Sequence, residues 1–206
     1  MNNNFNGDIF SLAQQDSVIE ESVMLTLNNF GLAWHISDLL IEYSAASLPP
    51  PQATVCLNGA GRSVVIPGQN CGFFVTPVIQ IAILEIRKSL GFFGLCLSSE
   101  THSIVPLKKR QKNDIGIEHF GLPWATVDLL IGGSAFMKTA QLENMLSDVY
   151  QWCNKRLAHF TLSQPDIKLE YIRDVSMVMI DVYFRLLFDA LGRPRPQIQP
   201  INSQIA

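Results

Sequence analysis

The chain has 206 residues, 48% of them hydrophobic and 16% charged, with a formal net charge of −3. This length allows one sizeable hydrophobic core, and so apolar a composition excludes a disordered chain. The charge is uneven, −6 over residues 1–86 and +3 over residues 87–206, so a polyanion would meet the C-terminal half. An excess of three positive charges is far below the basic stripe of a dedicated nucleic-acid-binding protein.

Targeting, membrane and redox signals are missing from the sequence. The first eight residues, MNNNFNGD, have neither the basic nor the apolar region of a secretory signal. The longest apolar stretch, residues 71–84, contains Pro77 and ends before Glu85. It suits a buried helix, because a membrane span needs about 20 apolar residues. The four cysteines lack CxxC or metal-ligand spacing, which predicts reduced, mostly buried thiols. We therefore expect a cytoplasmic protein with no membrane contact and no cofactor.

The first half of the chain is predicted to be helical on both sides of one insertion. Residues 17–46 have a helical pattern with an interruption near Gly31. Residues 48–70 contain three prolines followed by TVCL, NGAG and SVVI, which predicts a short β-hairpin or an ordered loop. The glycines there do not make a phosphate-binding loop, because no Lys-Ser/Thr pair and no helix follow them. Residues 71–97 predict a long apolar helix.

A polar connection and a short helix come next. Residues 98–116 are polar and cationic and include LKKRQK at 107–112. A helix is predicted to begin at Pro123, because proline is favoured in the first helical turn. Gly132 and Gly133 mark its end.

Two amphipathic helices and a tail close the chain. The helix predicted over 138–158 has an apolar stripe made of Leu142, Leu146, Val149 and Cys153. The last helix, 167–192, is predicted to bury one face made of Ile172, Val175, Met179, Val182, Leu186 and Ala190. The proline-rich tail is expected to be an unstructured arm.

These elements predict a mostly α protein, an antiparallel helical bundle with one β or irregular insertion. We divide it into an N-terminal helical extension at 1–47, a loop or hairpin at 48–70, the bundle at 71–192 and a flexible tail at 193–206.

One segment occurs twice. FGLAWHISDLLI at 30–41 and FGLPWATVDLLI at 120–131 share eight of twelve residues, and the match stops on both sides. This is not a solenoid repeat. The pattern predicts two similar helix starts with similar aromatic faces, which either pack in the core or form a docking patch for a partner chain.

The stretch NKRLAH at 154–159, which ends one helix before the final helix begins, resembles the motif of the HEPN superfamily of helical bundles. That group includes phage-defence and toxin–antitoxin ribonucleases, and its motif is written like RNKxAH. The resemblance covers about 71–192. It implies that the last two helices pack antiparallel, with His159 exposed at their junction. It further implies a homodimer that acts on RNA without a metal, and a cognate partner protein.

The motif departs from the family at one position. The catalytic arginine of the family should stand five or six residues before His159, where the chain has Asn154 and Cys153. Metal-free RNA cleavage needs a base for the 2′-OH and a cation for the developing phosphorane charge. His159 is a candidate base, and Arg156, about 60° away on a helix, is a candidate replacement for the missing cation. Asn154 is the motif's usual polar neighbour, which makes His159, Arg156 and Asn154 the candidate catalytic set.

Two further interpretations stay open. A histidine and cations in a last helical turn also complement the helix dipole without any catalysis, so the domain could be an inactive interaction or antitoxin-like module. The motif could also be a coincidence in an unrelated helical protein. For RNA binding, the candidate residues are Lys155, Lys108, Lys109 and Arg110. The other histidines have no carboxylate or thiol companions at ligand spacing, so no metal site is predicted.

Overall fold

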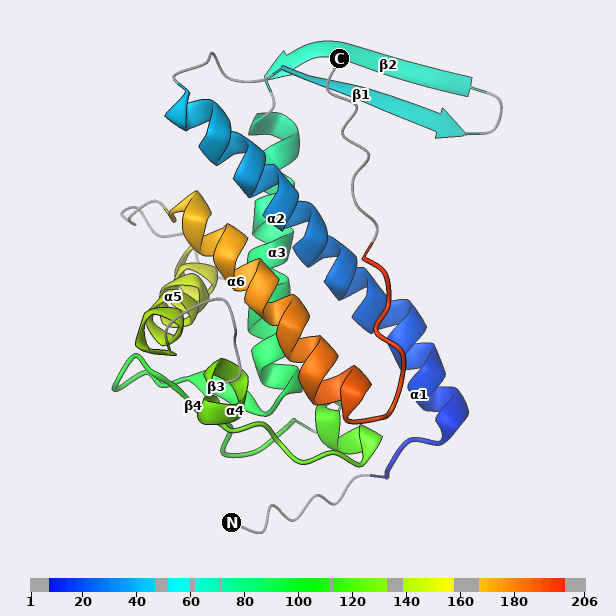
Figure 1. The fold of residues 1–206 in the computed structure, drawn as a ribbon, viewed down its shortest axis with the longest axis vertical. Coiled ribbons are helices and arrows are strands. Elements are labelled where there is room, and N and C mark those ends of the chain that lie inside the picture. Colours follow the sequence, from blue (N-terminus) through cyan, green and yellow to red (C-terminus); the bar gives the residue numbers. More distant parts are fainter. Residues whose placement is uncertain are drawn as a thin grey trace.

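Three helices form the body of the protein. The computed structural model describes residues 8–46, 52–59, 62–70, 72–111, 113–132, 139–157 and 167–198. Helices α2 (Met24–Ala45), α3 (Gly72–Phe92) and α6 (Leu169–Tyr183) pack against one another, and α2 runs opposite to the other two (Figure 1). The predicted mostly α architecture is confirmed.

The N-terminal helices form one continuous rod. Helix α1 (Leu12–Val18) begins with a capping box, in which Ser11 and Gln14 each bond the other's backbone N–H. A π-helical turn (Ile19–Val23) joins α1 to α2. The expected interruption near Gly31 is wrong, because Gly31 lies inside α2.

Side chains from both ends of the chain share one core. Leu27 and Phe30 of α2 have no exposed surface and belong to the same cluster as Ile83 of α3 and Val182 of α6. The separation of an N-terminal extension from a bundle beginning at 71 is therefore wrong: α2 is itself a bundle helix. An apolar helix face must be covered by some neighbour, and here α3 and α6 cover it.

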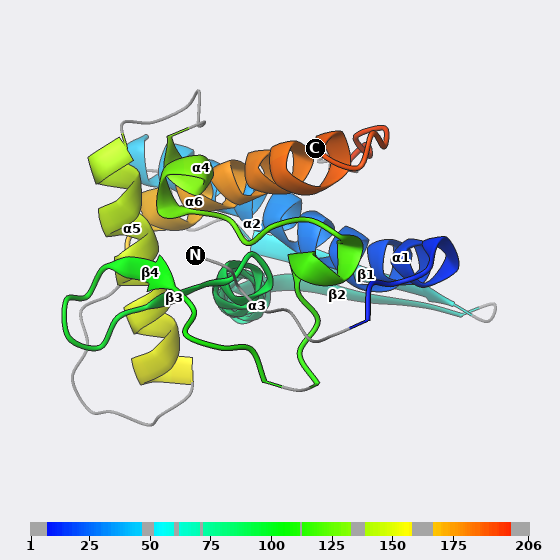
Figure 2. The ribbon, with the colours of Figure 1, turned by 90° about the horizontal axis from the view of Figure 1, so that it is seen from below.

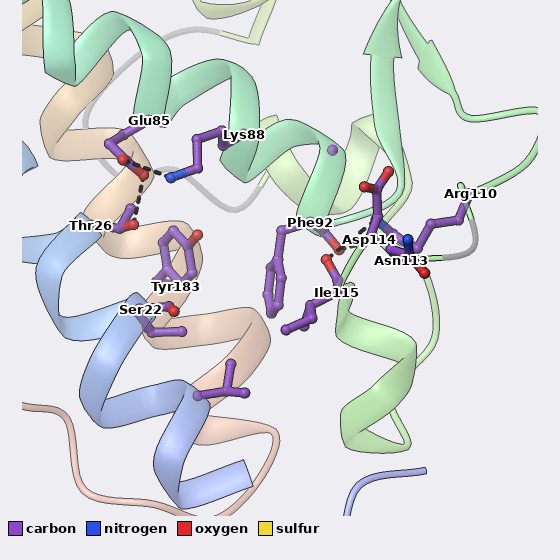
Figure 3. A pocket seen from close by; sticks show the side chains of 13 residues that line it. Ser22, Thr26, Glu85, Lys88, Phe92, Arg110, Asn113, Asp114, Ile115 and Tyr183 are labelled. Atoms are coloured by element: carbon purple, nitrogen blue, oxygen red, sulfur yellow. Dashed lines mark hydrogen bonds and ion pairs between the residues drawn. The ribbon is translucent and has the colours of Figure 1, made fainter. Parts of the chain in front are cut away.

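Buried polar groups also join the three helices. The Thr26 hydroxyl of α2 donates to the Glu85 carboxylate of α3 at 2.7 Å, and Lys88 donates to the other oxygen at 2.8 Å (Figure 3). Ser89 Oγ and Tyr183 Oη, on α3 and α6, lie 3.0 Å apart. Burial raises the pKa of Tyr183, and the hydrogen bond with Ser89 offsets part of that rise.

Two small antiparallel sheets are present among the described residues. Strands β1 (Gln52–Gly59) and β2 (Arg62–Asn70) form the hairpin that the sequence predicted. Strands β3 (Leu95–Leu97) and β4 (Ile104–Pro106) form a second one inside the expected bundle. The expectation that 48–70 would be the only β segment is wrong. Helix α3 ends at Phe92. Two residues later Gly94, with φ of 84°, turns the chain back, and its carbonyl accepts the Leu107 N–H at 2.8 Å.

The duplicated segment adopts two different structures. Its first copy lies within α2. Its second copy passes through a 3₁₀ turn (Ile117–Phe120), then Gly121 at φ 75°, and becomes helical only in α4 (Val127–Ile131). Thr126 caps α4 by accepting the Leu129 N–H at 3.1 Å. The predictions of two similar helix starts and of a helix beginning at Pro123 are therefore wrong.

Helix α5 (Thr139–Trp152) crosses the other helices. Figure 2 shows it running across α6, although the two were expected to pack antiparallel. It packs against α3 as well as α6, and it also contacts α4 and the small β3–β4 sheet. Antiparallel packing occurs instead between α2 and α6, so the expected arrangement of the last two helices is wrong.

The end of α6 differs from the predicted stripe. Ile172, Val175, Met179 and Val182 are fully buried as predicted, but Leu186 is half-buried and Ala190 is exposed. A π-helical turn (Phe184–Asp189) follows α6. Its wider turn shifts the buried face by one residue, to Leu187 and Phe188.

The start of the tail is ordered rather than flexible as expected. Residues 193–198 run back along the N-terminal rod (Figure 1). Arg193 pairs with Asp16 of α1 at 2.5 Å, and Arg195 pairs with Asp189 at 2.6 Å. Ile198 packs on the core where α2 has Gly31.

Candidate functional site

The predicted motif comes immediately after the helix α5, whose buried face leads up to it. Leu142, Leu146, Val149 and Cys153 have no exposed surface, which confirms the predicted stripe. Helix α5 continues into a π-helical turn (Cys153–Leu157). The side chains of Arg156 and Leu157, and all of His159, lie outside the described residues.

Two motif residues are placed by the structure. Asn154 is half-buried and Lys155 is exposed. Cys153, at one of the two positions where the family's arginine was expected, points into the core. A charged side chain at that position would be buried, so this position cannot present a cation to RNA.

An arginine from another helix approaches the end of α5. The guanidinium carbon of Arg87, on α3, lies 5.8 Å from the centroid of the Tyr150 ring on α5. Burial raises the pKa of the Cys153 thiol, and a hydrogen bond from Arg87 together with its charge offsets part of that rise. Burial likewise raises the pKa of Tyr150, and the charge of Arg87 opposes it. Arg87 therefore places a cation beside the residue at which the family's arginine is missing.

A second cation, Lys108, lies two residues after β4. Burial raises the pKa of Cys96 on β3, and the charge of Lys108 lowers it in part. The Cys96 thiol in turn affects the pKa of Tyr150, and both strands of this sheet contact α5. We call Arg87, Lys108, Tyr150 and Lys155 the α5-end cluster. It combines cations with an aromatic face, as single-stranded nucleic-acid sites do.

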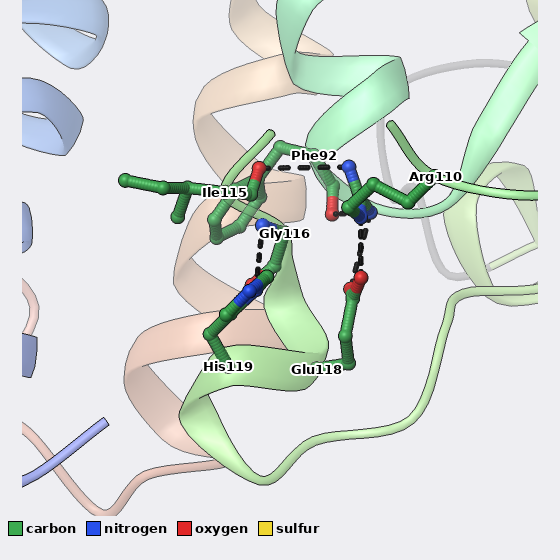
Figure 4. Close-up of polar contacts among 6 residues, drawn as sticks. All are labelled: Phe92, Arg110, Ile115, Gly116, Glu118 and His119. Carbon is green, nitrogen blue, oxygen red and sulfur yellow. Dashed lines mark hydrogen bonds and ion pairs between the residues drawn. The ribbon is translucent and has the colours of Figure 1, made fainter. Parts of the chain in front are cut away.

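Arg110, a predicted RNA-binding residue, is held in a buried ion pair. Its guanidinium forms a two-point ion pair with Glu118 and donates to the Phe92 carbonyl at 3.2 Å (Figure 4). The two side chains are only 10% and 6% exposed. A neutralised, buried guanidinium with most of its N–H donors engaged is poorly placed for the phosphate contact predicted for Arg110. Lys108 and Lys109, beside it in sequence, are exposed.

Arg87 and Tyr150 are not predicted as site residues by the sequence. Arg87 was visible as a cation that interrupts an apolar helix, but nothing local pairs it with a helix so far along the chain. Tyr150 lies three residues before the motif's first expected arginine position, on the same helix.

The chain has no detected relative, and its described residues contain no metal site. No model of a known protein family, no curated protein and no solved structure matches this chain. Among the described residues, no three His, Cys, Asp or Glu side chains gather as metal ligands would. None of the helices in the described part combines the length and the apolar content that a membrane crossing needs.

Proposed function

We propose that the chain is a HEPN-like cytoplasmic protein that acts on RNA at the end of α5, with metal-independent cleavage as its activity. The observation that supports this most is Arg87 beside Cys153, because it supplies a cation next to a position at which the family's arginine is missing. Lys108 and Lys155 extend the positive charge, and Tyr150 offers a ring for a base. The protein acts as a homodimer with a cognate partner protein, as its resemblance implies.

The reaction assigns one role to each group. His159 takes the 2′-OH proton, the 2′-oxygen attacks the phosphorus, and the bond to the 5′-oxygen breaks, which leaves a cyclic phosphate. The 5′-oxygen leaves with a proton from the imidazolium. Arg156 and Arg87 stabilise the charge on the phosphorane, while Asn154 orients the phosphate. Lys155, Lys108 and Lys109 contact phosphates and position the RNA.

The test is cleavage of end-labelled single-stranded RNA by the purified protein with EDTA present. His159→Ala and Arg156→Ala should each lower the rate by about 10²-fold or more, the usual value of a general base or a charge-stabilising donor. Lys155→Ala should mainly weaken binding and reduce its salt dependence. Equal rates for the wild type and His159→Ala would mean that the cleavage comes from a contaminant.

Arg87 has a matched control on its own helix. Arg87→Met keeps an apolar stem against Tyr150 but removes the charge, and we expect it to slow cleavage by roughly 10²-fold. Lys88→Met makes the same change in charge one residue later, on a face that does not meet α5, and should leave the rate unchanged. Equal effects of the two variants would contradict a local role for Arg87.

A second candidate function is an inactive interaction or antitoxin-like module. It is favoured by the complete burial of Cys153 and by Asn154 beside it, since neither position expected for the family's arginine then carries a cation. In that case the wild type binds RNA or a partner protein without cleaving RNA. Sedimentation of the wild type, alone and with RNA, tests the homodimer and the binding independently of cleavage.

A further inference from the structure

A cavity of about 470 Å³ opens on the side of α3 away from the α5-end cluster. The N-terminal rod, α3, α6 and the loop after β4 all line it (Figure 3). Sites for small organic molecules occupy roughly 300–1,000 Å³, so the cavity is large enough for one such ligand.

The walls of the cavity suit an apolar body. Phe92 and Tyr183 stack with their ring centroids 5.8 Å apart and an interplanar angle of 24°. Val23 continues this wall and is almost fully buried, at 4% exposure. Ile115 faces them from the loop and is 44% exposed, which is unusual for so large an apolar side chain. A planar or branched ligand would cover Ile115 and the ring edges.

The charges around the cavity favour a cation. The Glu85 carboxylate accepts two hydrogen bonds, from Thr26 and Lys88, and so keeps free acceptor positions. Asp114 lines the opposite side and forms no ion pair with any residue that the structure describes. Arg110 contributes little, because Glu118 neutralises it. Once Glu118 is counted with its partner Arg110, three carboxylates stand against two cations, a net charge of −1.

The ion pair with Lys88 shows that the Glu85 carboxylate binds an ammonium group. Its ammonium lies 2.8 Å from Glu85, but its side chain is 68% exposed and can swing into solvent. A ligand ammonium that took this place would restore the ion pair that it displaced. An ion pair of so exposed a lysine is weak, and its replacement costs little.

We propose that this cavity binds a small organic amine. The protonated amino group lies at Glu85 within the field of Asp114, and the apolar body lies against Phe92, Tyr183 and Ile115. This site is separate from the RNA site proposed above, and its occupancy does not depend on that function.

The binding test uses three probes that share an indole ring: tryptamine, its neutral analogue tryptophol, and the anion indole-3-acetate. Calorimetric titration of the purified full chain should give about tenfold tighter binding of tryptamine than of tryptophol, because charge-assisted hydrogen bonds are roughly twice as strong as neutral ones. Indole-3-acetate should bind most weakly. No binding of tryptamine at millimolar concentration, or a preference for indole-3-acetate, would overturn the proposal.

Variants of charged residues separate the amine site from an anion site. Glu85→Gln keeps an acceptor for Thr26 and should reduce the preference for tryptamine over tryptophol to about twofold or less. Lys88→Met removes the competing ammonium and should tighten tryptamine binding several-fold. An anion site would respond in the opposite sense to Lys88→Met, and that outcome would also refute the amine site.

Gly91 provides the steric control. It lines the cavity, and a Cβ there would meet no atom within 4 Å, so a side chain at this position projects into open space without a clash. Gly91→Leu should fill the cavity and weaken the binding of tryptamine and tryptophol at least tenfold, whereas Gly91→Ala should keep it. Circular dichroism verifies that both variants fold. Unchanged tryptamine affinity in Gly91→Leu would show that the probe binds elsewhere.

Discussion

The ion pair with Glu118 determines where the Arg110 side chain lies. It stands in a run of basic residues, yet it is buried, while its neighbours Lys108 and Lys109 remain in solvent. Glu118 holds it through two contacts, and its remaining donors reach the carbonyls of Phe92 and Ile115. The pair fastens the loop after β4 to the end of α3, and this loop also lines the cavity.

We predict that breaking this pair strongly destabilises the protein. Glu118→Ala leaves the buried Arg110 charge without a partner and should lower the free energy of unfolding by about 3–5 kcal/mol. The double variant Arg110→Met with Glu118→Leu should recover most of this loss, because an apolar pair of similar volume avoids the cost of desolvation. Urea denaturation measures both. Lys109→Met serves as the exposed control, within about 0.5 kcal/mol of the wild type; a loss as large as that of Glu118→Ala would contradict the assignment.

The two copies of the duplicated segment show how context determines an element. The first copy has Ala33 and His35 where the second has Pro123 and Ala125. Proline at 123 removes a backbone donor, and the chain at Gly121 is already in the left-handed region. A helix thus cannot run through the second copy, although eight of twelve residues are the same.

Gly31, in the first copy, is where α2 contacts the C-terminal arm, residues 193–198. A Cβ on Gly31 would lie 2.5 Å from Ile198 Cγ2, so the glycine allows the arm to pack closely. Gly31→Ala should therefore gain little or lose stability, although alanine in a helix interior is worth about 1 kcal/mol over glycine. In an Ile198→Ala background the same change should stabilise by about that amount. A double-mutant cycle measured by thermal unfolding tests this, and additive effects of the two changes would show that the arm does not contact Gly31.

At the scale of the whole molecule, one core links the N-terminal rod to the last helix. Residues from Ile19 to Phe188 contribute to it, and several ionisable groups are buried at its edges. Burial raises the pKa values of Cys153, Tyr150 and Tyr183, because each would have to lose a proton and become charged within a poorly hydrated site. Their stability contribution therefore depends on pH.

We predict that the protein loses stability at alkaline pH. A raised pKa in the folded state means that the full contribution is present below the unfolded pKa and is lost as the pH rises towards the folded pKa. The loss should begin near pH 9 for the thiol and near pH 10 for the phenols, by up to about 1.4 kcal/mol per pH unit for each group. Urea titrations from pH 7 to 11 under reducing conditions measure it. Cys153→Ala should flatten the first part of the profile and Tyr183→Phe the second; parallel profiles for all three proteins would contradict this origin.

Short-range patterns in the sequence alone determined much of the secondary structure of this protein. The mostly α composition, the hairpin between α2 and α3, the stripe on α5 and the inward direction of Cys153 all follow from patterns within a few residues. Helical periodicity, proline and glycine act over one or two turns, so they can be read directly from the sequence. The same applies to the absence of an arginine at positions 153 and 154, the two places where the family's arginine was expected.

Tertiary structure alone decided which distant residues meet. Arg87 approaches Cys153, Glu118 removes Arg110 from solvent, and Ile198 returns to Gly31. No periodicity encodes these pairs, because each depends on how apolar faces from separate helices are covered. The π-helical turn after α6 has the same cause: packing against the core, rather than propensity, shifts the buried face by one residue. For this reason the sequence located the motif, whereas the packing of α3 against α5 brought Arg87 to its side.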